Sequence, residues 1–485
     1  MRRIALSLLA LVALAVPAAA AAFANTEPLA AQEWYLDADR AWSFWPSQPE
    51  LFPVPVAVID SGIDGSNPDL QGRVLAAHSF VGGSPWTDEQ GHGTFVAGEI
   101  AANPTNGLGI AGLAFNARLL IAKVVAADGS VSLQGEVAAI RWAADRGARV
   151  INLSLGGVRD PLDPSFDTYS PLEQAAIDYA WAKGAVVVAA VGNGPQSPET
   201  PWRFADYPAA LPHVIGVSAV RRDGSVPEYS NRDAVYNDLA APGDALLSTI
   251  PLSLIDPNRP ACVDQPFSEC GSPEFRDAIG TSFAAPQVSA AAALLIGQDP
   301  SLRPEQVAYL LERGADDDTP VTGCPGCTVG RDPLTGFGTL DVQGSLSLLT
   351  GTPLPPADHY EPNDDAGPWA HALPPLPRTV SATLDYWDDQ VDVYRERLVA
   401  GQRLYVRLTS TGGARVALQL WPPGTHRVEA LDSSIGPLAR SESGRSQARV
   451  AATATRSGVY YVEAKLLSKS LTPVVYRLSL SRRSP

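Results

Sequence analysis

The sequence is short of positive charge and of long apolar segments. Of its 485 residues, 36 are Lys or Arg and 52 are Asp or Glu, which gives a formal net charge of −16. An acidic surface repels nucleic acid and anionic lipid, so neither is an expected partner. Beyond the leading segment no run of about 20 unbroken apolar residues occurs, which argues against a stable membrane anchor.

The first 24 residues have the features of a secretory signal peptide. Arg2 and Arg3 form a basic start, residues 4–16 are an apolar core, and Ala22-Phe23-Ala24 is a small-residue cleavage pattern. The alternative, a membrane anchor, is disfavoured because this apolar core is too short to cross a bilayer comfortably. We therefore expect residues 1–24 to be removed and the mature protein to be secreted to the extracellular medium.

Cysteine is scarce as well. The four residues are Cys262 and Cys270 in a Pro-rich stretch, and Cys324 and Cys327 in a C-P-G-C segment. In an exported chain disulfides are favoured over free thiols, and the sequence leaves all three pairings open. A zinc site would need the four thiolates together, and nothing else supports one. A redox role for C-P-G-C lacks a surrounding thioredoxin-like unit.

What the chain does contain is 45% hydrophobic residues, enough for a sizeable core. Between about residues 32 and 349, short apolar runs alternate with segments of helical periodicity. This alternation is typical of a mainly parallel sheet covered by helices on both faces, with sites at the carboxyl ends of the strands. The predicted strands are 54–59, 119–125, 150–155, 185–191 and 214–220, and the predicted helices are 94–102, 136–146, 172–183 and 282–296.

The pattern changes after residue 350. A Pro-rich stretch, T-G-T-P-L-P-P-A at 350–357, indicates a linker. Beyond it, short strand-like runs without helical periodicity predict an all-β sandwich. These runs are 380–384, 404–408, 416–420, 459–464 and 475–480. The predicted division is an α/β domain at 25–350, a linker at 351–357 and a β-sandwich at 358–485.

Three motifs carry the side chains of nucleophilic catalysis. An apolar strand ends in D-S-G at Asp60, G-H-G-T places His92 at a helix start, and G-T-S places Ser282 ahead of an apolar helix. Each alone has an ordinary explanation as a cap, a turn or a helix start. Together, in the order Asp, His, Ser, they match one of the known orders of a catalytic triad.

These residue types supply what acyl transfer needs. The Ser282 hydroxyl requires an adjacent base, which His92 can provide, and Asp60 would orient the imidazole. Another apolar strand ends in G-N-G at Asn193. That asparagine is either a turn residue or, beside a triad, a donor in the oxyanion hole.

In this order the motifs resemble those of the subtilisin-like serine proteases (peptidase family S8), over about residues 27–349. They are D-S-G at 60–62, G-H-G-T-F-V-A-G at 91–98, G-N-G at 192–194 and G-T-S-F-A-A-P at 280–286. Segments 105–114 and 143–157 are most similar to the thermitase-like branch. The resemblance implies a three-layer α/β fold and a monomeric serine endopeptidase that cuts proteins or peptides through an acyl-enzyme.

The resemblance also implies a substrate site. Two walls of the S1 pocket, which receives the P1 side chain of the substrate, would be formed by Ser154, Leu155, Gly156, Gly157 and Gly192. Asp206 would lie at the floor, where the family often has a small or neutral residue. A carboxylate pointing inward there would favour Arg or Lys at P1, whereas one pointing to solvent would not.

The family binds calcium, and catalysis itself needs no cofactor. The implied calcium ligands are Glu27, Asp69, Asn106 and the carbonyl groups of Leu108 and Ile110. Oxygen-only ligands suit Ca²⁺, and the alternative is a loop without metal. The usual N-terminal prodomain has no room between residues 25 and 60, and insertions occur at 158–170 and 251–276.

The C-terminal module resembles the bacterial pre-peptidase C-terminal domain. The similar segments are Y-E-P-N-D-D at 360–365, D-Q-V-D-V-Y at 389–394, G-Q-R-L-Y-V-R-L at 401–408 and G-V-Y-Y-V-E at 458–463. A second calcium site and a solvated acidic rim are equally good interpretations of Asp358, Glu361, Asn363 and Asp392.

Three functions are open at this point. The first is a broadly acting extracellular endopeptidase, and the second is a narrow processing protease for basic P1 residues. The third is an inactive binding or adhesion protein. The intact set of Asp60, His92, Ser282 and Asn193 counts against this third function.

Overall fold

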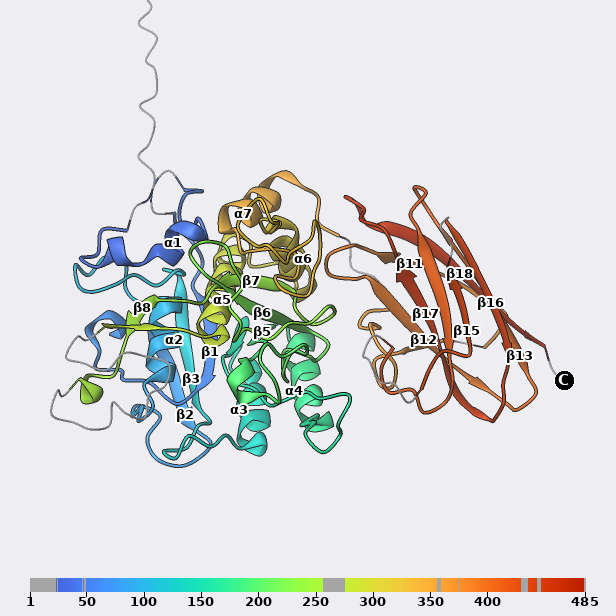
Figure 1. Cartoon of the computed structure of the whole chain (residues 1–485), viewed down its shortest axis with the longest axis horizontal. Coiled ribbons are helices and arrows are strands. Elements are labelled where there is room, and N and C mark those ends of the chain that lie inside the picture. The colour runs from blue at the N-terminus through green and yellow to red at the C-terminus, as the bar shows by residue number, and fades with distance from the viewer. Residues whose placement is uncertain are drawn as a thin grey trace, which may run out of the picture.

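The structure is a computed structural model that describes residues 23, 25–45, 47, 49–255, 275–355, 359–373, 375–428, 435–442 and 446–483. An α/β domain, coloured blue to yellow in Figure 1, lies beside an all-β domain, coloured orange to red. The predicted signal peptide, apart from Phe23, lies outside the described residues. So do Cys262, Cys270 and Asp358.

The α/β domain is built on a seven-stranded sheet in which every neighbouring pair is parallel. Its order is β2-β3-β1-β4-β5-β6-β7. The strands are β1 (Val54–Asp60), β2 (Val74–Ser79), β3 (Ala117–Lys123), β4 (Val150–Leu153), β5 (Val186–Ala190), β6 (Val214–Val220) and β7 (Leu239–Pro242). Most of these strands are apolar along their whole length because both faces of the sheet are covered.

Alternate residues of each strand enter two different cores. In β1, Val56 and Val58 belong to the core that includes residues of α1, α2, α5, α6 and α7, whereas Ala57 and Ile59 belong to the core that includes residues of α3 and α4. The helices are α1 (Trp34–Ala38), α2 (His92–Ala101), α3 (Leu133–Asp145), α4 (Pro171–Ala182), α5 (Thr281–Gln298), α6 (Pro304–Gly314) and α7 (Val342–Gly351). The result is a three-layer arrangement with the sheet in the middle.

Helix α5 is the most deeply placed helix of this domain. Sixteen of its 18 residues are buried, and Ser282 and Gln298 are the two that are not. A short antiparallel ribbon of β8 (Leu246–Thr249) and β9 (Phe275–Ala278) leads the chain into its first turn. The described residues of this domain also contain four 3₁₀ turns: η1 (Ala30–Gln32), η2 (Pro68–Leu70), η3 (Gly194–Gln196) and η4 (Leu252–Leu254).

The C-terminal domain is a sandwich of two sheets around one apolar core. One sheet has the order β10-β12-β17-β14-β15 and the other β11-β18-β13-β16. The strands are β10 (His371–Ala372), β11 (Arg378–Leu384), β12 (Val391–Leu398), β13 (Arg403–Ser410), β14 (Val416–Trp421), β15 (Ala439–Glu442), β16 (Gln447–Thr453), β17 (Gly458–Leu466) and β18 (Val474–Arg483). None of the described residues beyond 358 is helical.

The predicted fold class, a three-layer α/β domain with a mainly parallel sheet followed by an all-β sandwich, is confirmed. Some boundaries were wrong. The strand predicted at 150–155 ends at Leu153, because Gly157 leaves the sheet to pair with Tyr207. The helix expected from residue 94 begins at His92, after Gly91 turns the chain with φ 82°. Gly351, predicted as linker, belongs to α7.

Among the helices of the described residues, none combines the length and apolar character needed to span a bilayer.

Candidate active site

Asp60 and His92 meet at the carboxyl edge of the sheet. Asp60 is the last residue of β1 and His92 the first of α2. The Nδ1 atom of His92 lies 2.9 Å and 3.0 Å from the two carboxylate oxygens of Asp60, and the Ser61 amide donates to the nearer oxygen at 2.7 Å. The Asp60 side chain is 2% exposed and that of His92 is 19% exposed. The pair is therefore largely shielded from water, with one part of the imidazole accessible.

Asp88, which the sequence analysis missed, organises the start of α2. Its Oδ1 accepts from the Gly91 amide (2.8 Å) and the Ser61 hydroxyl (2.7 Å). Its Oδ2 accepts from the amide (2.8 Å) and the hydroxyl (2.6 Å) of Thr94. Asp88 thus supplies the side-chain cap that the Gly91 N-cap lacks. Its position three residues before Gly91, ahead of an apolar helix, was the available signal.

Negative charge shapes the protonation of His92. Burial lowers the pKa of the imidazole, but the charge and hydrogen bond of Asp60 and the charge of Asp88 raise it. The net direction is upward from the ordinary value. Because Asp60 accepts from Nδ1–H, the neutral tautomer leaves Nε2 as the basic nitrogen.

Ser282 stands at the second position of α5, between two residues that contact the rest of the site. The Phe283 ring lies 5.2 Å from the His92 ring between centroids. The Thr281 amide donates to Oδ1 of Asn193 at 3.1 Å. The turn that carries Ser282 therefore lies between the histidine and the asparagine, at the positive end of a long helix.

Pro286 explains why Ser154 belongs to this site. Four residues after Ser282, it has no amide hydrogen, so the Ser282 carbonyl cannot make its usual bond within the helix. The Ser154 hydroxyl donates to that carbonyl instead, at 2.6 Å. It is held in turn by Asn152 at 2.9 Å, which accepts from Ser289 of α5 at 2.8 Å. The strand predicted as a pocket wall is thereby fastened to the serine-bearing turn.

Asn193 is oriented by the same turn. Its Oδ1 accepts from the Thr281 amide. The Nδ2 group is therefore the part of the side chain that can donate to a developing oxyanion. Gly192 before it has φ 98°, a conformation that favours glycine. This tight bend at the end of β5 brings the asparagine over the start of α5.

The predicted pocket residues come together around Asp206. Gly157 and Tyr207 exchange two backbone hydrogen bonds of 2.8 Å, and the Asp206 amide donates to the Val191 carbonyl at 2.9 Å. The glycines leave room for this approach. A Cβ on Gly156 would lie 2.6 Å from the Tyr207 carbonyl oxygen, and one on Gly192 would lie 2.0 Å from Oδ2 of Asp206.

Asp206 points inward, so the solvent-facing alternative does not hold. The residue is 5% exposed, and its Oδ1 has no hydrogen-bond partner among the residues that the structure describes. Burial raises the pKa of the carboxyl to about 7, against the hydrogen bonds from the Arg159 backbone and the Asn231 side chain. A buried carboxyl with one free oxygen is prepared to receive a donor or a cation.

The five residues predicted to bind calcium also lie around one loop. Oδ1 of Asp69 accepts from Asn106 Nδ2 (2.8 Å) and Oδ2 from the Ile110 amide (3.0 Å). The Leu108 amide donates to Oδ1 of Asn106 at 2.9 Å. Glu27 is 3% exposed and accepts from the Gly107 amide at 3.4 Å, and its buried Oε2 has no partner within the described part of the chain. That orphaned oxygen and the oxygen-rich donor set fit a calcium ion.

Two side chains at this loop, Asn106 and Glu33, bear on how calcium would bind. Asn106 presents nitrogen to Asp69, so ligation through its oxygen requires the amide to turn over. Glu33, which the sequence analysis missed, lies beside the site and accepts from the Ala111 amide at 3.0 Å. Burial raises the pKa of Glu33 to about 7, against three hydrogen bonds and with the charge of Asp69 adding to the rise.

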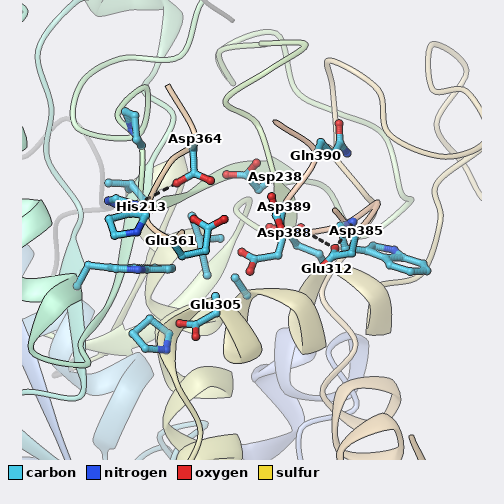
Figure 2. Close-up of a pocket in the computed structure, with 18 of the residues that line it drawn as sticks. His213, Asp238, Glu305, Glu312, Glu361, Asp364, Asp385, Asp388, Asp389 and Gln390 are labelled. Carbon is cyan, nitrogen blue, oxygen red and sulfur yellow. Dashed lines mark hydrogen bonds and ion pairs between the residues drawn. The ribbon is translucent and has the colours of Figure 1, made fainter. Parts of the chain in front are cut away.

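The C-terminal domain contains a second cluster of acidic side chains. Oxygen atoms of Glu361, Asp389 and Asp392 lie within 4.8 Å of one another. Burial, with the charges of the other two, raises the pKa of Asp389 well above its ordinary value. Asp392 and Asn363 are fully buried, so the interpretation of these residues as a solvated rim was wrong. Figure 2 shows Glu361 and Asp389 among further acids lining a cavity between the domains.

Cys324 and Cys327 form a disulfide in the loop after α6. This resolves one pairing in favour of the disulfide interpretation of C-P-G-C.

Comparison with known proteins agrees with this geometry. Residues 53–341 match the subtilase family, peptidase S8. The chain is 38% identical over 244 residues to a thermophilic serine proteinase of Bacillus sp. (strain AK1). The aligned region covers 50% of this chain and 52% of that protein. Thermitase of Thermoactinomyces vulgaris is 35% identical over 263 residues, 54% of this chain and 80% of thermitase.

The chain is also similar to solved structures. Sphericase is 30% identical, with a TM-score of 0.51 over 64% of this chain and 97% of sphericase. The chain spans about half the length of the thermophilic proteinase and most of the length of thermitase. The family match ends at residue 341, before the all-β domain begins. By its α/β domain, with the acid, the base and the serine at one edge of the sheet, the chain belongs to the subtilase family of serine endopeptidases.

Proposed function

We propose that the protein is a secreted serine endopeptidase that cuts proteins or peptides through an acyl-enzyme, with Asp60, His92, Ser282 and Asn193 as its catalytic residues. One observation carries the proposal: the Asp60–His92 pair lies beside the turn that holds Ser282. Apart from the last residue of α5, Ser282 is the helix's one residue that is not buried. A serine kept accessible at the start of a buried helix suits a nucleophile better than a structural residue.

In the first half-reaction, the Ser282 oxygen attacks the carbonyl carbon of the scissile bond. Its proton passes to Nε2 of His92, and Asp60 stabilises the imidazolium. The carbonyl π electrons move to oxygen, and Asn193 Nδ2 and the backbone amide of Ser282 donate to the oxyanion. The tetrahedral intermediate collapses when His92 returns the proton to the leaving amine. Water then repeats the sequence on the acyl-enzyme and releases the acid.

Calcium is proposed at the loop around Asp69, with Glu27, Asn106 and the carbonyl groups of Leu108 and Ile110 as the other ligands. A bound ion would neutralise two buried carboxylates and join the N-terminal segment to the loop at 106–110. The Leu29 amide already donates to the Gly109 carbonyl at 2.9 Å. The role is structural, because this loop is separate from the residues that perform the chemistry.

Secretion and a monomeric state are part of the proposal. Secretion rests on the leader at residues 1–24, and the monomeric state rests on the resemblance to the subtilisin-like family. Proteins or peptides are the expected partners, and neither nucleic acid nor a membrane is.

A second candidate, a processing protease for basic P1 residues, is favoured by Asp206. Its carboxyl lies between the two predicted walls of the S1 pocket, and one of its oxygens has no partner in the described ranges of the chain. An Arg or Lys side chain entering that pocket would supply the missing donor and an opposite charge.

Labelling by a fluorophosphonate probe in the presence of Ca²⁺ tests the proposed activity. The mature wild-type chain should label and Ser282→Ala should not. Ser165→Ala, which removes the hydroxyl of an exposed serine, is the matched control and should label like the wild type. Absence of labelling in a folded wild type would instead favour the inactive binding protein.

A further inference from the structure

The floor of the predicted S1 pocket is one short segment, residues 205–213, called the floor segment below. Its first part is fixed to the pocket walls by the hydrogen bonds of Asp206 and Tyr207 to Val191 and Gly157. Its middle is a tight turn, in which the Ala210 amide donates to the Asp206 carbonyl at 2.9 Å. Any displacement of Ala210 is therefore transmitted to the backbone of Asp206.

The far side of the floor segment faces the C-terminal domain. Nη1 of Arg427, in the loop after β14, donates to the Ala210 carbonyl at 2.9 Å. Three residues further, Nε2 of His213 lies 3.1 Å from Asp364, the contact drawn in Figure 2. His213 has φ 65°, which non-glycine residues seldom adopt. The C-terminal domain thus contacts the segment at two points, the Ala210 carbonyl and the His213 side chain, both beyond the residues that pair with the pocket walls.

Arg427 enters the α/β domain as a buried charge. Its side chain is 9% exposed, and its guanidinium lies 5.7 Å from the ring centroid of Tyr169 and 5.2 Å from that of Tyr236. The Tyr169 ring in turn lies 5.7 Å from that of Tyr207 in the floor segment. Both aromatic rings can stabilise the cation, since each offers the face of a π system.

The C-terminal domain also prepares this arginine for its contact. Oδ2 of Asp365 lies 3.4 Å from Nε of Arg427, while Oδ1 accepts from the amide of the next residue, Val428, at 2.6 Å. The Ala366 amide donates to the same oxygen at 2.7 Å. Asp365 is itself 2% exposed. One buried carboxylate therefore pairs by charge with the guanidinium and accepts hydrogen bonds from the amides of Val428 and Ala366.

A contact made only to join two domains would not need a buried guanidinium aimed at this one carbonyl. The acceptor belongs to the turn that begins at Asp206, and the second ring partner, Tyr236, packs in the core below the same segment. Small displacements of a substrate-binding group change rates strongly, about 10²-fold for 1 Å. We therefore expect the position of Asp206 at the pocket floor to depend on the hydrogen bond from Arg427 to the Ala210 carbonyl.

We propose that Arg427 of the C-terminal domain is a positioning residue for the S1 pocket, which holds the floor segment from behind and thereby sets P1 selectivity. This proposal rests on the proposed endopeptidase function. It makes the all-β domain a working part of the substrate site rather than a detachable appendage.

The test compares P1 selectivity in the full mature chain with Ca²⁺ present. The substrates are two peptide p-nitroanilides that differ only in having Phe or Lys at P1, and the quantity is the ratio of their kcat/KM values. This ratio does not depend on the amount of active enzyme, so partial misfolding leaves it unchanged. Fluorophosphonate titration counts the active sites in each preparation.

Arg427→Ala should change the ratio by roughly 5-fold to 50-fold, mainly through KM, while titrated sites still react with the probe. Arg427→Lys keeps a donor and a charge and should recover part of the wild-type ratio. Arg427→Met keeps the buried stem without a donor, and it replaces the alanine variant if that variant does not fold. Arg415→Ala, an exposed arginine of the same domain, should leave the ratio unchanged.

A ratio within twofold of wild type in both Arg427→Ala and Arg427→Met would overturn the proposal. That outcome is distinct from failure of the proposed function, in which the wild type itself would neither label nor cleave either substrate.

Discussion

Replacing Asp88 by asparagine removes one charge and two acceptor positions from the start of α2 without changing side-chain size. The amide nitrogen must then face either the Gly91 amide or the Thr94 amide, because the carboxylate accepts from both. One buried amide loses its partner, at a cost of about 1–3 kcal/mol. The bonds that remain lose the assistance of a full charge, about 1 kcal/mol each. Two such bonds remain on the oxygen that asparagine keeps, so the expected total is about 3–5 kcal/mol of lost stability.

The same substitution has a second effect, on the chemistry. The negative charge of Asp88 helps to raise the pKa of His92. Its removal should lower that pKa, so the acid limb of the kcat/KM profile moves to lower pH. Urea unfolding of the Ser282→Ala background, which prevents self-digestion, measures the stability, and the pH profile uses the active enzyme.

Asp163→Asn is the matched control, since it removes the same group from an exposed turn. It should change stability by less than about 0.5 kcal/mol. A loss below about 1 kcal/mol in Asp88→Asn, with an unmoved pH profile, would refute the role assigned to this carboxylate.

The other predictions concern charge elsewhere in the molecule. Asp206→Asn should reduce the kcat/KM of a P1-Lys substrate more than that of a P1-Phe substrate. In the wild type the Lys/Phe ratio should rise as pH increases through about 7, where Asp206 loses its proton; a flat ratio would contradict the inward carboxylate as a specificity group. Calcium should stabilise the folded state in the Ser282→Ala background and so raise its Tm. At a calcium concentration of about 100 times the Kd the gain in unfolding free energy is about 2.7 kcal/mol, and Asp69→Asn should abolish it. Equal Tm values for wild type with Ca²⁺ and with chelator would contradict the proposed calcium site. Glu99 is fully buried in α2, and neither of its carboxylate oxygens has a hydrogen-bond partner among the described residues. Burial together with the charge of Asp39 raises the pKa of its carboxyl well above the ordinary 4.5. The folded state then binds the proton more tightly than the unfolded state, so this group lowers stability as pH rises above about 4.5. Glu99→Gln should therefore gain about 1 kcal/mol or more in stability over wild type at pH 8 and show a smaller difference at pH 5, measured by thermal unfolding.

Much of the α/β domain could be predicted from the sequence because its local signals agree. The strand ending in Asp60 is apolar up to that residue, and the helix after Gly91 was predicted, although its start was placed two residues late, at residue 94 instead of His92. By contrast, β7 (Leu239–Pro242) is four residues long and contains a proline, so its local pattern resembles a loop. Its place at the sheet edge comes from pairing with β6, which is a tertiary effect.

In the candidate active site, too, residues marked by local motifs could be predicted, whereas their tertiary partners could not. Motif order was enough to indicate Asp60, His92, Ser282 and Asn193, and the proline four residues after Ser282 was a readable sign that a helix carbonyl needed another donor. The donor itself, Ser154, lies 128 residues away in sequence. Arg427 is further removed still, because its partner Ala210 is 217 residues earlier and in another domain. No local period or spacing encodes how two domains meet.

Helix α5 has a consequence for how such a protein would age in solution. Because the helix is enclosed along almost its whole length, Ser282 cannot leave its place unless the core opens. Under the proposed activity, a warmed sample would contain fully competent molecules together with unfolded chains that these molecules can digest. Inactivation should then accelerate with protein concentration, and dilute stocks should outlast concentrated ones.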